Sequence, residues 1–293
     1  MKYRKISCIF IFYTWRIRLK DWDIKKLCEI LEDCGKIALR HYECPAYEFK
    51  KDHSVVTVAD VEIEQYLSSV LSSPEDSTFM IGEESSDSLP EDYIRAALRG
   101  TTWIVDPIDG TAPYSNRIPV WGTSIALARN GIIEEGAIYI PILKELIISS
   151  GPDIFYTDSF DGTASSLRKF HFTPFEFDAK GIISISQLLS KKGEVNMPNT
   201  VQAISSCVYS FTSMALGRYA AYVVKAKIWD IAAGWAILSK LGFSSITESG
   251  EALPLSLSGP FAEGPTRWAM PEHAVIAYGQ ETVNNVIKSL RFQ

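Results

Sequence analysis

The stretch Trp103–Thr111 reads W-I-V-D-P-I-D-G-T and joins an apolar strand to a turn that carries carboxylates. The strand is predicted to end at Asp106, because Pro107 fixes the backbone immediately after it. The pair Asp109 and Gly110 then favours a sharp turn. Two carboxylates three residues apart across such a turn can converge on one point. The stretch therefore predicts a polar site at the end of a buried strand.

The oxygen atoms of this turn suit a hard cation. The carbonyl oxygen of Ile108 can face the same point as the two carboxylates, which gives an all-oxygen pocket of the kind that Mg²⁺ prefers. The backbone N–H groups of Gly110, Thr111 and Ala112 follow immediately, and if a helix begins there they form an anion site beside the metal. Asp, Pro and Gly are also common in surface turns, so the stretch taken alone fits either interpretation.

Three further segments each place a carboxylate at a strand end or a helix start. Glu83 lies in Gly82–Ser85, G-E-E-S, after an apolar stretch, and could equally belong to a solvated acidic loop. Asp230 stands before a predicted helix that contains Ala and Gly, where the alternative is a simple N-cap. Asp60 ends the stretch Val56–Asp60, V-T-V-A-D, at the start of another predicted helix, with the same alternative.

The composition is that of a globular protein. The chain has 293 residues, of which 46% are hydrophobic and 22% charged, enough for one large domain or two medium ones. The net charge of −6 argues against nucleic acid as the main partner, because phosphate backbones need a basic surface. The five cysteines include no C-x-x-C pair and the four histidines are scattered, so we expect a reducing cytoplasm and no zinc site.

The N-terminal segment 1–20 differs from the rest of the chain. Basic residues precede a short apolar run, as in a signal peptide. The run ends at Trp15 and meets Arg16, Arg18 and Lys20 without a small-residue cleavage site, and it is too short to span a membrane. We therefore expect an N-terminal extension outside the fold and no membrane partner, with a secretion signal as the minority alternative.

The remaining chain alternates helical and strand patterns. Helical spacing is predicted for residues 21–42 and 61–71, whereas the polar stretch 151–173 is predicted to be a loop and a domain boundary. Strands are predicted near residues 101–105, 121–128, 132–140, 181–186, 219–224 and 273–278, and further helices at 206–216, 231–241 and 281–290. This mixture predicts layered α/β or α+β architecture.

Four motifs together resemble the inositol monophosphatase superfamily of magnesium-dependent, lithium-sensitive phosphatases. They occur in the order of the family, and the resemblance runs from about residue 21 to near the C-terminus. The third motif is highly specific, and the set of four argues strongly against coincidence. The motifs are V-T-V-A-D at Val56–Asp60, G-E-E-S at Gly82–Ser85, W-I-V-D-P-I-D-G-T at Trp103–Thr111 and W-D-I-A-A-G at Trp229–Gly234.

The resemblance implies a fold and a set of site residues. The fold is a layered α-β-α-β-α sandwich of the inositol monophosphatase and fructose-bisphosphatase type. Residues 21–155 would form an N-terminal α+β half with most metal ligands, and residues 156–293 a C-terminal α/β half that contributes Asp230 and substrate contacts. The implied ligands for two or three Mg²⁺ ions are Glu83, Asp106, the Ile108 carbonyl, Asp109 and Asp230. The implied catalytic residues are Thr111 with Asp60, and the implied phosphate-binding turn is Gly110, Thr111 and Ala112.

The activity implied by the resemblance is Mg²⁺-dependent hydrolysis of a small phosphorylated metabolite. Metal-activated water would attack phosphorus directly, without a covalent phosphoenzyme. We expect a soluble cytoplasmic enzyme that could assemble as a homodimer. Related alternatives are histidinol-phosphate phosphatase, 3′,5′-bisphosphate nucleotidase and fructose-1,6-bisphosphatase activity. A different alternative is a catalytically silent relative that serves a regulatory or binding role.

Several positions depart from the family pattern and bear on the substrate. The usual Asn is missing from Thr111–Tyr114, and Gly242 is not followed by a second Gly. Val223 stands where the animal enzymes place an acidic residue against the inositol ring, so we expect inositol monophosphate not to be the best substrate. The stretch Ile118–Thr123, I-P-V-W-G-T, resembles the histidinol-phosphate phosphatase branch. Trp121 within it could form an aromatic wall for an imidazole or a base, or could belong to the core.

Overall fold

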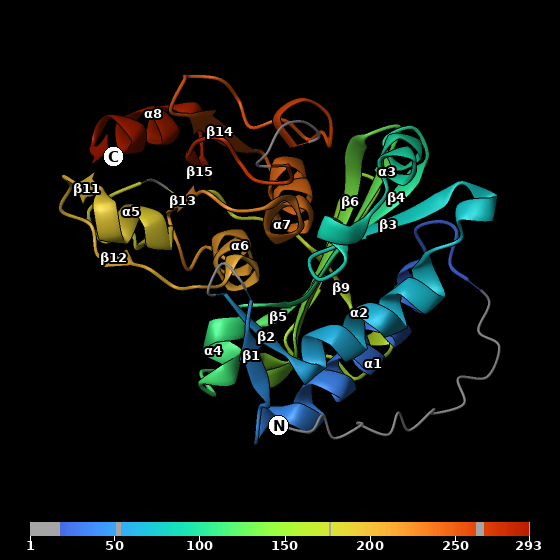
Figure 1. Ribbon diagram of the computed structural model, residues 1–293. Coiled ribbons are helices and arrows are strands. Elements are labelled where there is room, and N and C mark those ends of the chain that lie inside the picture. The colour runs from blue at the N-terminus through green and yellow to red at the C-terminus, as the bar shows by residue number, and fades with distance from the viewer. Residues whose placement is uncertain (1–17, 51–53, 176, 262–266, 293) are drawn as a thin grey trace, which may run out of the picture.

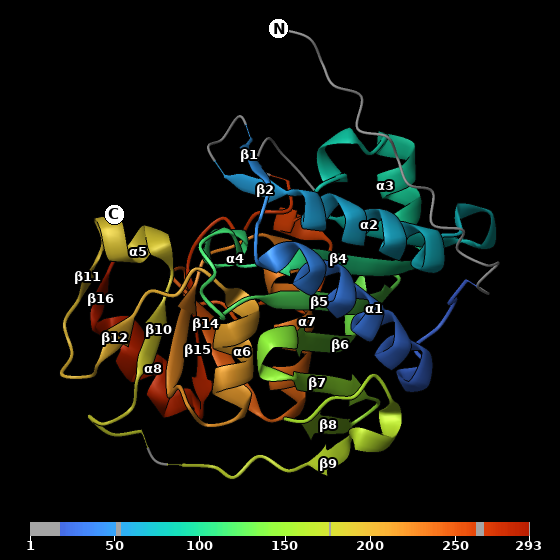
Figure 2. The same cartoon turned by 90° about the horizontal axis from the view of Figure 1, so that it is seen from below.

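The structure is a computed structural model that describes residues 18–50, 54–175, 177–261 and 267–292. Two sheets and three helix layers alternate through these residues, so that a seven-stranded and a five-stranded sheet share a middle layer of helices (Figure 1). A second view shows the large sheet with helices on both faces and the smaller sheet beside it (Figure 2). The predicted α-β-α-β-α layering is confirmed.

The seven-stranded sheet holds the N-terminal half of the protein. Strands β3 and β4 pair in parallel, and the other neighbouring strands pair antiparallel. Most of its central residues are buried, because helices cover both faces. In spatial order the strands are β3 (Thr78–Gly82), β4 (Thr101–Asp109), β5 (Gly122–Arg129), β6 (Ile132–Ile140), β7 (Glu145–Ser150), β8 (Asp153–Thr157) and β9 (Arg168–Phe170).

Two helices, α1 (Ile24–Tyr42) and α2 (Val58–Leu71), cover one face of this sheet. Helix α1 is capped by Asp23, whose side chain accepts hydrogen bonds from the backbone N–H groups of Lys25 and Lys26. The buried residues of α1 recur every three or four positions, as the sequence predicted. The two helices therefore bury one apolar face each against the sheet.

The middle layer consists of α6 (Cys207–Ala215) and α7 (Ile228–Lys240), which pack between the two sheets. Helix α7 lies close to the large sheet because Gly136 of β6 has no side chain. A Cβ atom at Gly136 would lie 2.2 Å from the carbonyl oxygen of Ala233, which no real side chain tolerates. This close approach fixes how α7 rests on the sheet.

The five-stranded sheet forms the C-terminal half. In spatial order its strands are β12 (Val201–Gln202), β10 (Ile183–Ile185), β13 (Ala221–Val224), β15 (Ala274–Tyr278) and β14 (Phe243–Thr247). Its outer face packs against α5 (Gln187–Lys192) and α8 (Gln280–Lys288), which complete the fifth layer.

Short elements lie at the edges of these layers. The other described strands and α-helices are β1 (Tyr47–Phe49), β2 (Val55–Thr57), β11 (Glu194–Val195), β16 (Leu290–Arg291), α3 (Glu91–Ala97) and α4 (Thr111–Ser115). The 3₁₀ helices are Pro74–Asp76, Ser86–Ser88, Pro141–Leu143, Ala164–Ser166 and Gly259–Phe261. Within the described ranges, no helix has the length and apolar character that crossing a membrane requires.

The boundary between the two halves lies later than predicted. The division between residues 155 and 156 falls inside β8, and the stretch 151–173 contains both β8 and β9 instead of a plain loop. These strands extend the large sheet by successive antiparallel pairing. The sequence signal for β9 is weak because this edge strand has three residues and is largely exposed. The N-terminal half therefore runs to Phe170.

The predicted N-terminal extension also needs a correction. Residues 1–17 lie outside the described residues, but residues 18–20 pack on the fold. The side chain of Leu19 is 4% exposed, and its backbone N–H donates to the carbonyl oxygen of Val70 at 2.8 Å. Burial of this one apolar residue ties the segment to the end of α2, although its neighbours are basic.

Candidate metal and catalytic site

Three carboxylates from three elements meet at one end of the large sheet. Carboxylate oxygens of Glu83, Asp106 and Asp230 all lie within 4.8 Å of one another. Parallel pairing of β3 and β4 brings the first two together, since the last residue of β3 lies opposite Val105. Helix α7 supplies the third, and its first turn is held at β5 by a 3.0 Å hydrogen bond from the Ser124 hydroxyl to a carbonyl oxygen of α7.

The electrostatics of this cluster fit a cation. Asp106 is buried, and its Oδ1 atom has no hydrogen-bond partner among the described residues. Burial raises the pKa of Asp106 well above its ordinary range, and the charges of Glu83, Asp109 and Asp230 add to this. Burial, followed by the charge of Glu83, also raises the pKa of Asp230 to about 6. Buried carboxylates this close repel one another, so a divalent cation would lower the free energy of their ionised forms.

Asp109 lies beside the cluster, and the start of helix α6 holds its side chain. It ends β4 after a register shift, and its Oδ2 accepts a 2.9 Å hydrogen bond from the backbone N–H of Cys207 at the start of α6. Its Oδ1 is buried and has no partner in the described part of the chain. Burial and the charge of Asp230 raise the pKa of Asp109 to about 8. The carboxylate is therefore oriented, with one oxygen left for a ligand.

Asp60 and Thr111 approach each other next to these carboxylates. The Thr111 hydroxyl lies 3.0 Å from the carbonyl oxygen of Ile108 and 3.4 Å from Oδ1 of Asp60. Since a hydroxyl has one proton, it donates to one of these oxygens at a time. Burial raises the pKa of Asp60 to about 7, against hydrogen bonds from Thr57 that lower it. Such a carboxylate can take up or release a proton near neutral pH.

Both helix-start carboxylates lie further inside their helices than an N-cap. Thr57, not Asp60, caps α2, and Asp60 sits at the third helical position, where its side chain accepts from the backbone N–H of Thr57. Asp230 occupies the matching place in α7 and accepts from the backbone N–H of Lys227 at 2.7 Å. The alternative that either residue is a simple N-cap is therefore wrong.

Strand β4 runs to Asp109, with a register shift after Asp106, so the predicted strand end at Asp106 is wrong and the turn follows at Gly110. Helix α4 begins at Thr111, which is the condition stated for an anion site at the N–H groups of residues 110–112. Gly110 has φ of 87°, a left-handed conformation that favours glycine. A Cβ atom there would also lie 3.1 Å from both the Cβ of Ser206 and the carbonyl oxygen of Val120. The chain therefore requires glycine at this point.

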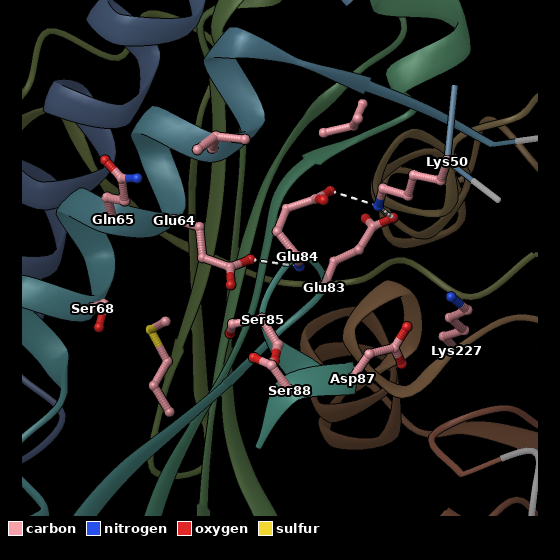
Figure 3. Close-up of a pocket in the computed structure, with 13 residues that line it drawn as sticks. Lys50, Glu64, Gln65, Ser68, Glu83, Glu84, Ser85, Asp87, Ser88 and Lys227 are labelled. Carbon is pink, nitrogen blue, oxygen red and sulfur yellow. Dashed lines mark hydrogen bonds and ion pairs between the residues drawn. The ribbon is translucent and has the colours of Figure 1, made fainter. Parts of the chain in front are cut away.

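A cavity of about 810 Å³ opens beside Glu83 and contains a lysine that sequence reasoning missed (Figure 3). The ammonium of Lys50 lies 3.0 Å from Oε1 of Glu83 and 2.7 Å from Oε1 of Glu84. Burial works to lower the pKa of Lys50, but these two carboxylates outweigh it and raise the pKa. No spacing in the sequence links this residue to the G-E-E-S motif.

Two residues considered for substrate recognition lie in the core. Trp121 is fully buried, and its ring packs against Tyr42 and Tyr114 with centroids 5.1 Å and 4.8 Å away. Trp121 is therefore part of the core, and the aromatic-wall alternative is wrong. Val223 is fully buried in the outer core of the five-stranded sheet, together with residues of α8 such as Val283.

Comparisons with known proteins show the family of the chain and its fold. The family model described as the inositol monophosphatase family matches residues 23–283. An inositol monophosphatase of Dictyostelium discoideum is 24% identical over 242 residues, which are 78% of this chain and 86% of the relative. A histidinol-phosphatase of Chlorobaculum parvum is 34% identical over 128 residues, 42% of this chain and 46% of the relative. A solved structure of an IMPase/NADP phosphatase with Mg²⁺ and phosphate is 18% identical, with a TM-score of 0.65 over 90% of this chain and 92% of that one.

Proposed function

The chain belongs to the inositol monophosphatase family, and we propose that it is a Mg²⁺-dependent phosphatase of small phosphate monoesters. The observation that carries this proposal is the convergence of Glu83, Asp106 and Asp230 within 4.8 Å. The buried, unpartnered Oδ1 atoms of Asp106 and Asp109 support it, because each is an acceptor that the described residues leave unused. A catalytically silent relative would have no need of this complete set.

The proposed metal ligands are those that the sequence suggested. Glu83, Asp106 and Asp230 would hold one Mg²⁺ ion, and Asp109 with the carbonyl oxygen of Ile108 would complete a site for a second or third. Bound Mg²⁺ supplies charge neutralisation for phosphate oxygens and lowers the pKa of a coordinated water. The donor set consists of oxygen atoms alone, which suits Mg²⁺ better than zinc.

The proposed catalytic pair is Thr111 and Asp60. The hydroxyl of Thr111 would orient the attacking water, and Asp60 would accept its proton, because burial places the pKa of this carboxyl at about 7. The N–H groups of Gly110, Thr111 and Ala112 at the start of α4 would bind the phosphate oxygens. No covalent intermediate is required, since water is the nucleophile.

The proposed substrate is a small phosphorylated metabolite other than inositol 1-phosphate. Selective binding of a polyol needs polar groups placed to meet its hydroxyls. Val223 offers none, and its side chain is buried in the outer core of the smaller sheet. Because Trp121 is also in the core, an aromatic wall gives no reason to prefer an imidazole or a base.

A phosphate-release assay tests this function. Inositol 1-phosphate, histidinol phosphate, a nucleoside 3′,5′-bisphosphate and fructose 1,6-bisphosphate are compared by kcat/KM with Mg²⁺ and with a chelator. We expect release from at least one substrate, only with Mg²⁺, and no lead for inositol 1-phosphate. A lead of about tenfold for inositol 1-phosphate, about 1.4 kcal/mol in transition-state free energy, would refute the argument from Val223. Release that ignores the chelator would refute the metal site.

A further inference from the structure

Glu64 is a buried acidic residue that the proposed mechanism does not use. It lies on α2, its side chain points toward the end of β3, and it is 5% exposed. Its Oε2 accepts a 2.8 Å hydrogen bond from the backbone N–H of Glu84, as Figure 3 shows. Burial raises the pKa of Glu64, and hydrogen bonding from the hydroxyl and backbone N–H of Ser85, together with that of Glu84, works against this rise. Donors from two consecutive residues therefore converge on one side chain.

The carboxylate of Glu64 also lies close to Gly82, the residue before Glu83. A Cβ atom at Gly82 would lie 2.6 Å from the carboxyl carbon of Glu64 and within 2.8 Å of both its oxygens. A larger residue at position 82 would require the Glu64 carboxylate to move from its present place. Glu64 thus contacts the chain on both sides of Glu83, at residue 82 before it and at residues 84 and 85 after it.

We propose that Glu64 is a positioning residue for the metal site, which fixes the Gly82–Ser85 turn so that Glu83 points toward Asp106 and Asp230. This inference rests on the proposed function, because it assumes that these carboxylates hold Mg²⁺. The turn follows the end of a strand, where no ladder hydrogen bonds continue to hold the backbone. The hydrogen bonds to Glu64 replace them, so the direction of the Glu83 side chain is set before a metal arrives.

This role predicts that a change at Glu64 weakens the affinity of the site for the metal. If the turn is released, Glu83 samples other directions, and binding a metal must then restrict it again, which weakens metal affinity. Groups that orient metal ligands through hydrogen bonds typically change metal affinity by about 10- to 100-fold when they are replaced. The chemistry at saturating metal changes less, because the ligands are in place once Mg²⁺ is bound.

The test compares Glu64→Gln with wild type and with Glu62→Gln. Glutamine keeps the shape of the side chain, but its amide nitrogen cannot accept one of the donors. Glu62 lies on the same helix and pairs with Arg40 and His41 at the surface, which makes it a matched control. The dissociation constant of Mg²⁺ is measured by calorimetric titration without substrate, and kcat is measured at saturating Mg²⁺.

We expect Glu64→Gln to raise the Mg²⁺ dissociation constant about tenfold and to keep kcat within about threefold, with no change in Glu62→Gln. A purely structural role would lower the melting temperature and leave Mg²⁺ affinity unchanged, and that result would overturn the inference. If Glu64→Gln does not fold, Ser85→Ala decides instead: it removes one donor and should weaken Mg²⁺ binding in the same direction, and unchanged affinity overturns the inference. Wild-type protein that binds no Mg²⁺ would refute the proposed metal site itself.

Discussion

At the scale of single residues, Asp109 shows how one side chain can be both held and available. Its Oδ2 accepts from the backbone N–H of Cys207, while its buried Oδ1 has no partner among the described residues. We expect Asp109→Asn to keep the first contact and lose the charge, because the amide oxygen can still accept. Turnover should fall by about 100-fold or more, because charge neutralisation at the phosphate is lost. Turnover and thermal melting at saturating Mg²⁺ measure the two effects.

A surface carboxylate serves as the control for this prediction. Asp92→Asn removes a charge from a side chain that is 89% exposed and should leave both quantities unchanged. If Asp109→Asn keeps most of the wild-type rate, Asp109 does not belong to the site. A large fall in melting temperature, with lost turnover, would instead indicate a structural role.

The sequence predicted a site residue only where that residue lies in one of the four motifs or next to it. Asp106 and Asp109 were predicted from the turn that contains them, and the structure brings Asp106 together with Glu83 and Asp230. Lys50 and Glu64 were not, because their contacts join elements that are distant in sequence and neither stands at an informative spacing. A buried glutamate two turns into an amphipathic helix looks like any other polar residue until its partners are known.

At the scale of elements, the position of α7 decides where Asp230 lies. We expect Gly136→Ala to push α7 from the sheet, because the new methyl group would meet the carbonyl oxygen of Ala233 at 2.2 Å. Overpacking of this kind costs about 1–3 kcal/mol. The melting temperature should fall by about 3–10 °C, and the apparent affinity for Mg²⁺ should fall with it.

Gly151→Ala is the control for this substitution. Its φ of 56° is left-handed, unlike that of Gly136 in strand β6, and a Cβ atom there meets nothing within 4 Å. Gly151→Ala should lower the free energy of unfolding by only about 1 kcal/mol, because alanine is less favourable than glycine in a left-handed conformation. A loss at Gly136→Ala no larger than the loss in the control would contradict the packing clash with Ala233.

Element boundaries were the least predictable feature of the fold. Strands β5 and β6 were predicted near their observed bounds because they are long and largely buried, whereas β4 runs three residues past its predicted end at Asp106. Strands β8 and β9 were not predicted: both are short, their residues are only partly buried, and β9 lies at the edge of the sheet. Helices α2 and α7 begin about three residues earlier than predicted, because an acidic residue at the third helical position was taken for a cap.

At the scale of the whole molecule, the clustered carboxylates link stability to pH. Burial holds the pKa of Asp60 at about 7 and that of Asp109 at about 8, whereas an unfolded chain titrates Asp near 3.9. Below these values the folded metal-free protein keeps protons that the unfolded chain has lost, so its free energy of unfolding decreases as pH rises toward about 8. Burial lowers the pKa of His273 from its ordinary value, against the hydrogen bond and charge of Glu248.

Denaturant unfolding in a chelator, at pH of about 7 and about 8.5, measures this dependence. We expect lower stability at the higher pH in the chelator, and a smaller difference with Mg²⁺, since the cation favours the ionised carboxylates. Stability that rises with pH in the chelator would contradict the repulsion inferred for the site.

The central claim is that the carboxylates at the end of the large sheet bind the Mg²⁺ on which phosphate release depends. The most direct measurement is a Mg²⁺ titration of phosphate release and of melting temperature, for wild type and Glu83→Gln side by side. The account predicts that wild type is inactive in a chelator, that rate and melting temperature rise together with Mg²⁺, and that Glu83→Gln shifts both curves to concentrations about tenfold or more higher. Wild-type turnover without metal, or identical curves for the two proteins, would contradict it.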